Sequence, residues 1–93
     1  MKMTEIPKEQ LGEVYFGTRD VLSNTSDKER RIYSLQKALL LGNLYHHKVN
    51  ISFYDKEGRK YWVNTTIWSV DDSLISLKGG RNIPITAIED IEF

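Results

Sequence analysis

The C-terminal half of the chain constrains the fold most, because it consists of short apolar runs separated by polar turns. Runs of this length, bounded by Gly, Pro, Asp and Ser, are typical of β-strands. Short connections favour antiparallel neighbours, and a series of such strands can close on itself. We therefore expect residues 48–93 to form a small, strongly bent, five-stranded antiparallel barrel. Its expected strands are VNISFYD, KYWVNTTIWSV, LISLKG, RNIPI and IEDIEF.

The turns and the long second run give this barrel its expected shape. The polar turn DKEG ends in glycine, as a bulged hairpin return requires, and Gly79-Gly80 provides a second tight turn. Pro84 cannot donate a hydrogen bond to a strand ladder, so its strand should lie at an edge or be broken there. Bulky residues alternate on both faces of the run YWVNTTIWSV, which indicates a bent strand.

One helix is expected before the sheet, at residues 26–42. Ser26 and Glu29 have the spacing of a capping box, in which each side chain satisfies a free backbone N–H of the other. Gly42 stands where a left-handed residue would end the helix, and Leu44 stands where a Schellman motif places its hydrophobic contact. The apolar stripe expected to pack on the sheet is Ile32, Leu35, Ala38 and Leu39.

Residues 1–25 are interpreted as a leader or edge segment. Residues 6–11 predict one helical turn with Pro7 at its first position, and residues 13–16 predict a short edge strand. The whole chain, residues 1–93, is then expected to be a single α+β domain that is mainly β. Its expected core includes Ile32, Leu35, Leu39, Val63, Ile67, Leu77 and Ile88.

The composition excludes several classes of site. Thirteen Lys and Arg balance thirteen Asp and Glu, so no overall field attracts nucleic acid or an anionic membrane. The absence of cysteine excludes disulfides, thiol nucleophiles and cysteine-based zinc sites. No apolar run could span a bilayer, and the N-terminus lacks the apolar core of a signal peptide. We expect a soluble cytoplasmic protein without a cofactor.

The stretch from Val49 to Leu77 resembles the first motif of Sm proteins. An apolar strand is followed by a glycine turn, a long second strand, an Asp at the next turn and an L-x-L-like strand. The ending IPITAIEDI is similar to the close of Hfq-type Sm proteins, in which Ala-Ile also lies between the last two strands. The resemblance covers roughly residues 30–93 and implies an N-terminal helix packed on an SH3-like or Sm-like barrel.

The resemblance does not extend to the RNA site of that family. Hfq-type proteins bind uridine-rich RNA partly through a Lys-His pair just before Ala-Ile, and this chain has Ile85 and Thr86 there. Thr65 stands where the Sm pattern usually has a glycine that lets the second strand bend. The RNA contacts are thus not matched residue by residue, and a fold alone does not fix a function.

Aromatic and basic side chains of the strands are the candidate ligand contacts. Exposed rings can stack on bases while Arg and Lys reach phosphates. The alternative interpretation is that the rings fill the barrel and pack under the helix. The candidates are Tyr54, Arg59, Lys60, Trp62, Trp68, Lys78 and Arg81.

The other polar groups indicate neither a catalytic nor a metal site. His46 and His47 are neighbours in an extended segment and point to opposite sides, which does not favour chelation of one metal. Asp71 and Asp72 are typical of a β-turn, in which the carboxylates bond the backbone. Arg31 and its basic neighbours, interrupted by acids, predict a solvated face of the helix.

Two functions remain as hypotheses. The first is a non-catalytic module that mediates protein–protein interaction or self-assembly, through strand edges or a helix face. The second is binding of RNA or single-stranded nucleic acid through the exposed aromatic and basic residues. The zero net charge and the missing Lys-His pair favour the first hypothesis. No nucleophile–base pair can be assembled for an enzyme.

Overall fold

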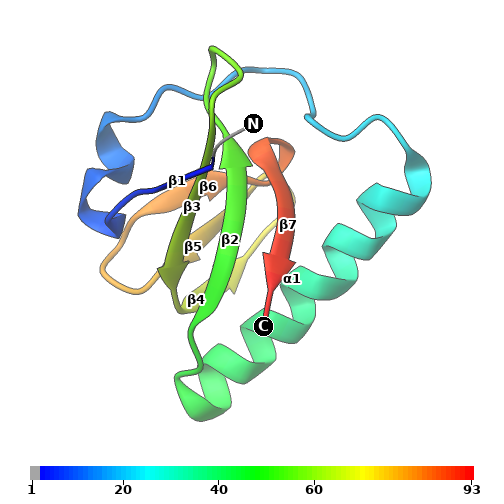
Figure 1. Ribbon diagram of the computed structural model, residues 1–93. Helices are drawn as coiled ribbons and strands as arrows, with labels where there is room; N and C mark the ends of the chain where they lie inside the picture. Colours follow the sequence, from blue (N-terminus) through cyan, green and yellow to red (C-terminus); the bar gives the residue numbers. More distant parts are fainter. Residues whose placement is uncertain (1–2) are drawn as a thin grey trace.

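The computed structural model describes residues 3–93 and has an α+β architecture, with one α-helix and mostly antiparallel strands (Figure 1). The helical elements are η1 (Lys8–Glu13), α1 (Thr25–Tyr45) and η2 (Ile85–Ala87), of which η1 and η2 are 3₁₀-helices. The strands are β1 (Thr4–Glu5), β2 (Val49–Tyr54), β3 (Lys60–Thr65), β4 (Ile67–Val70), β5 (Leu74–Leu77), β6 (Asn82–Pro84) and β7 (Ile88–Glu92).

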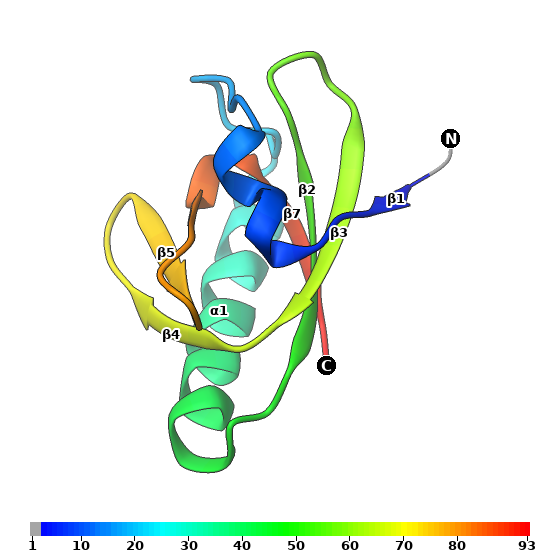
Figure 2. The ribbon, with the colours of Figure 1, turned by 90° about the vertical axis from the view of Figure 1, so that its left-hand side faces the viewer.

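The strands form two sheets. Sheet A has the order β1-β3-β2-β7 and sheet B the order β4-β5-β6. All paired strands are antiparallel except β1 and β3, which pair in parallel. Figure 2 shows the sheets meeting where β3 runs into β4, with η1 covering one side of the space between them and α1 the other.

The prediction of a closed five-stranded barrel is wrong, because β6 and β7 do not pair and β1 adds a strand from the leader. Pro84, which has no N–H, ends β6, and η2 follows it directly. At the start of β7, the carbonyl of Ile88 accepts a hydrogen bond from Arg31 of α1. A side chain of the helix, not a neighbouring strand, is thus the partner of this carbonyl.

The predicted bend of the long second strand is confirmed. β3 pairs within sheet A and β4 within sheet B, so the chain changes direction between them. Thr65, Thr66 and Ile67 at this change of direction are all buried. The strand assignment breaks at Thr66, whose carbonyl accepts a hydrogen bond from the Lys78 backbone N–H. One continuous segment thus supplies a strand to each sheet.

The helix is longer than predicted at both ends. Asn24 is the N-cap, and its side chain accepts hydrogen bonds from the backbone of Ser26 and Asp27, so the predicted capping box does not form. Gly42 lies inside the helix, and the left-handed residue that ends it is His46, with φ 54°. A Cβ at residue 42 would overlap the backbone carbonyl oxygen of Ile67, so glycine permits close approach of α1 to β4 here.

Most of the predicted core is confirmed. Leu35, Val63, Ile67, Leu77 and Ile88 are buried, and Leu39 is half-buried against the core. Ile32 is 53% exposed, and Leu44, the expected capping contact, is exposed as well. The stripe that α1 does bury is Arg31, Ser34, Leu35, Ala38 and Gly42. The two small residues and glycine bring the helix close to the sheets.

The leader is part of the fold. Ile6 and Leu11 are buried in the core, and η1 lies close to the predicted helical turn after Pro7. The predicted strand at residues 13–16 is absent, because Glu13 ends η1 and the next residues have no strand assignment. The carbonyl of Tyr15 instead accepts one hydrogen bond from the Lys56 backbone. The leader's contribution to sheet A is β1.

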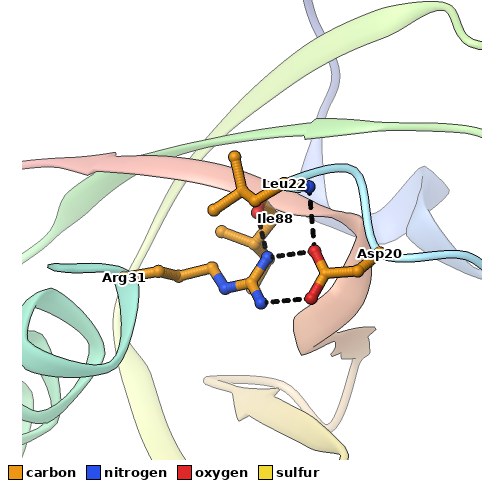
Figure 3. Close-up of polar contacts among 4 residues, drawn as sticks. All are labelled: Asp20, Leu22, Arg31 and Ile88. Carbon is orange, nitrogen blue, oxygen red and sulfur yellow. Dashed lines mark hydrogen bonds and ion pairs between the residues drawn. The ribbon is translucent and has the colours of Figure 1, made fainter. Parts of the chain in front are cut away.

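An ion pair between buried Arg31 and partly buried Asp20 joins the leader to the helix (Figure 3). Arg31 donates two hydrogen bonds to the carboxylate of Asp20, from Nη1 over 2.8 Å and from Nη2 over 2.7 Å. The same Nη1 also donates to the carbonyl of Ile88 over 2.9 Å, and the Leu22 backbone N–H donates to Asp20. Arg31, predicted as part of a solvated face, therefore joins leader, helix and sheet A.

Candidate binding surfaces

Three of the seven candidate contact residues lie together on the outer face of sheet A. Tyr54, Lys60 and Trp62 belong to the neighbouring strands β2 and β3 and alternate with the buried residues of these strands. Their side chains are half-buried. In the views of Figures 1 and 2 no helix crosses this face of the sheet. It is therefore accessible to another molecule.

The centre of this face is a hollow of about 470 Å³, named here the Trp62 hollow. The register places Trp62 opposite Ser52 on β2, and Ser52 opposite Asp90 on β7. Trp62 and Asp90 thus lie on the two strands that flank β2. These two strands are separated by two strand spacings, about 9.6 Å. The small side chain of Ser52 between them leaves the space open. The hollow is lined by Met3, Asn50, Ser52, Lys60, Trp62, Glu89, Asp90 and Glu92.

A polar network closes one end of the hollow. Lys60 Nζ lies 2.5 Å from Glu89 Oε1, and the Tyr54 hydroxyl donates to Glu89 Oε2 over 3.1 Å. The bond to Glu89 raises the pKa of Lys60 above its ordinary value, so its ammonium stays charged. Burial and the same carboxylate raise the pKa of Tyr54, which keeps its phenol protonated. Lys60 is thus already bound to a carboxylate.

The other four candidates do not join this surface. Arg59 lies in the β2–β3 turn, where its Nε donates to Asp55 Oδ2 over 2.8 Å. Trp68 is the extra residue at a bulge in β4, between the paired residues Ile67 and Ser69, and is 48% exposed. Lys78 and Arg81 flank the Gly79-Gly80 turn between β5 and β6 and are exposed. The seven residues therefore form no single basic and aromatic face.

A second surface lies on α1 and was not predicted from the sequence. Ile32, Tyr33, Leu40 and Leu44 are each more than half exposed. Their spacing places them on neighbouring rows of one helix side, and half-buried Leu39 and Val70 border the same region. We name these six residues the outer helix face. A shallow hollow of about 590 Å³ lies over part of it. The signal was present in the sequence as a second set of apolar residues at helical spacing.

The remaining polar candidates are structural. The carboxylate of Asp71 accepts hydrogen bonds from the backbone N–H groups of Ser73 and Leu74, as expected for a turn. These bonds lower the pKa of Asp71. Within residues 3–93, no three His, Asp or Glu side chains come together as metal ligands. No helix in the same part of the chain has the length and apolar character needed to cross a membrane.

No protein-family model matches the chain, and no curated protein or solved structure matches it significantly. A function is therefore inferred from geometry, namely from the Trp62 hollow and the outer helix face.

Proposed function

We propose that this protein is a non-catalytic protein-interaction module that self-associates through the outer helix face. The observation that supports the proposal is the exposure of four large apolar side chains on one side of a helix whose other side is buried in the core. Exposed apolar surface of this extent is typical of interaction sites in soluble proteins, because covering it removes apolar area from water. The proposed occupant is a second copy of the same chain.

A second copy fits because two exposed apolar residues of the outer helix face, Tyr33 and Leu40, exchange places about a two-fold axis. In an antiparallel pair of α1 helices with the axis between Gln36 and Lys37, Tyr33 meets Leu40 of the second copy, and Leu40 meets Tyr33. Such contacts are favourable because they remove aromatic and aliphatic surface from water, and a two-fold axis repeats each of them. The 21-residue helix is about 31 Å long, and these two reciprocal contacts lie near its middle.

Charge does not oppose this pairing. The chain has no net charge, so two copies do not repel each other through their overall fields. The residue nearest the axis with a charge is Lys37, and its Nζ lies 4.7 Å from the centre of the Phe93 ring. This cation–π contact holds the ammonium against the C-terminus of the same copy.

Nucleic-acid binding, the alternative hypothesis, has no specific observation in its favour. Of the four basic candidates, Arg59 and Lys60 are bound to carboxylates, and Lys78 and Arg81 lie at a different turn. Trp62 is surrounded by more acids than bases. Phosphate contacts depend on a concentration of positive charge, which this arrangement does not offer.

The test is the solution mass of the full chain by light scattering on a sizing column, at low and high salt. We expect a dimer of the 10.8 kDa chain at both salt concentrations, because an apolar interface is little screened by salt. Leu40→Glu should give a monomer with an unchanged circular dichroism spectrum. Lys56→Glu, an exposed charge change in the β2–β3 turn, is the matched control and should stay dimeric. A wild-type monomer at about 100 μM, where a micromolar interface would be occupied, contradicts the proposal.

A further inference from the structure

We propose that the Trp62 hollow binds a lysine or arginine side chain presented by an extended polypeptide. The inference concerns a surface that shares no residue with the outer helix face, so it does not depend on self-association. It rests on the shape of the hollow, on its charge and on the aromatic side chain at its wall.

The shape of the hollow follows from the strand register. Trp62 forms one wall on β3, and Asp90 and Glu92 form the other on β7. Ser52 and Asn50 of β2 form the floor between these walls. Because β2 lies between its two partners, the hollow runs along the strand direction, which suits an extended segment. The Ser52 hydroxyl donates to the Asp90 carbonyl, and Asn50 Oδ1 accepts from Asn64. The Asn50 NH₂ group as a donor and the Ser52 oxygen as an acceptor are left to bond a peptide backbone.

The charge of the hollow selects the partner. Glu89, Asp90 and Glu92 contribute three carboxylates and Lys60 one ammonium, a balance of −2 among the lining residues. Glu89 and Lys60 neutralise each other at the closed end. Within residues 3–93, neither Asp90 nor Glu92 belongs to an ion pair. The unbalanced carboxylates repel a phosphate backbone and attract a cation.

The aromatic wall completes the site for a cation on a long stem. A cation is attracted to the face of an indole more strongly than to that of the other aromatic rings. A Lys or Arg stem can also cover the apolar part of Trp62 while its charged end reaches Asp90 or Glu92. A small inorganic cation would use only the carboxylates, whereas a cationic side chain uses both walls. The arrangement therefore favours a basic residue within an extended polypeptide.

The experiment uses the full chain and the capped peptides Ac-Gly-Ser-Arg-Ser-Gly-NH₂ and its citrulline counterpart, followed by NMR through the indole N–H signals. Citrulline has nearly the shape of arginine and no charge. We expect the arginine peptide to shift the Trp62 indole signal, with Trp68 unchanged as an internal reference. The citrulline peptide should bind at least about tenfold more weakly. Equal shifts with both peptides would overturn the proposal.

Variants assign the contacts. Asp90→Asn combined with Glu92→Gln should weaken arginine-peptide binding by about tenfold, the loss expected for two exposed charge contacts. Asp72→Asn, which removes an exposed carboxylate in the β4–β5 turn, should leave it unchanged. Equal binding by the double variant and the wild type would contradict the assignment, provided that their melting temperatures agree.

Two further titrations distinguish this proposal from self-association and from nucleic-acid binding. The same titration on the Leu40→Glu variant should give the same affinity, whether or not that variant and the wild type differ in mass. A ten-nucleotide uridine strand should leave the Trp62 signal unshifted. A shift with the uridine strand and none with the arginine peptide would instead assign the hollow to nucleic acid.

Discussion

Thr65 has a buried hydroxyl group that the fold does not use. Its side chain is 1% exposed, and its Oγ1 has no hydrogen-bond partner within the described residues. We expect Thr65→Val to raise the free energy of unfolding by about 1 kcal/mol, because valine has the same shape without the desolvated hydroxyl. Urea denaturation measures the change. Val63→Thr, which introduces a hydroxyl at a buried position of the same strand, should lower stability; a loss in both variants would contradict this account.

Asp20 gives the fold a dependence on pH. Its hydrogen bond from Arg31 lowers the carboxyl pKa below the ordinary 3.8, so the folded state binds this proton less readily than the unfolded state does. The stabilisation is therefore complete above the unfolded-state pKa and is lost as the pH falls through the lower folded-state value. We expect unfolding measured between pH 5 and pH 2 to show a shallower acid dependence for Asp20→Asn than for the wild type.

The same substitution has a larger effect at neutral pH. Arg31 would remain buried, with 4% of its side chain exposed, and without a negative partner. Removing one member of a fully buried ion pair costs about 3–5 kcal/mol. Because Asp20 is 21% exposed, we expect a smaller loss here, on the order of 2 kcal/mol. Lys28→Asn, next to the pair but half-buried, is the control and should cost less than about 1 kcal/mol. Equal losses in the two variants would contradict a special role for the ion pair.

Neither member of this pair could be identified from the sequence. Asp20 lies in a loop without periodicity, and Arg31 has basic neighbours that indicate a solvated helix side. The pair forms only because the leader returns across the helix, and that path is set by tertiary contacts. Turn residues were predictable because their requirement is local: Gly58, Gly79 and Gly80 all have positive φ.

At the scale of elements, Gly42 shows why the end of the helix was misplaced. Glycine both ends helices and permits close packing, and the sequence does not distinguish these uses. We expect Gly42→Ala to lower stability by about 2 kcal/mol, because the new Cβ meets the Ile67 carbonyl, although alanine favours helices. Asn43→Ala, an exposed neighbour, should be neutral or slightly stabilising. Thermal unfolding compares the two variants. A higher melting temperature for Gly42→Ala would contradict the claim that α1 and β4 need glycine for their close approach.

The strands themselves were largely predictable, and their closure was not. Each expected run contains a strand, since alternation and turn residues are local signals. Whether β6 meets β7 depends on η2 and on where α1 packs, which involve residues far apart in the sequence. For the candidate contact residues, too, local pairing was predictable and the long-range arrangement was not. The register brings Tyr54, Lys60 and Trp62 together, whereas the bend and the bulge send Trp68 elsewhere.

At the scale of the whole molecule, the two proposed surfaces combine. A dimer formed through the outer helix face would carry two Trp62 hollows, one on each copy. We expect a peptide with two arginine segments, joined by a flexible linker that spans both hollows, to bind tighter than the single segment by a factor of at least about ten. Isothermal titration measures both affinities. The gain should vanish in Leu40→Glu, and a gain retained in a monomer would point to two sites on one chain.

The hydrogen bond from Arg31 to the Ile88 carbonyl also bears on how long the protein survives in concentrated solution. An uncovered strand edge is a template on which another chain can add a strand, and repeated addition leads to fibres. Arg31 covers such a position at the start of β7. In Arg31→Met the helix can still form, but the Ile88 carbonyl loses this donor and becomes available to a neighbouring chain. We expect that variant to accumulate thioflavin-positive aggregates on storage while the wild type remains clear. That result would indicate that the Arg31 side chain limits the addition of strands to β7.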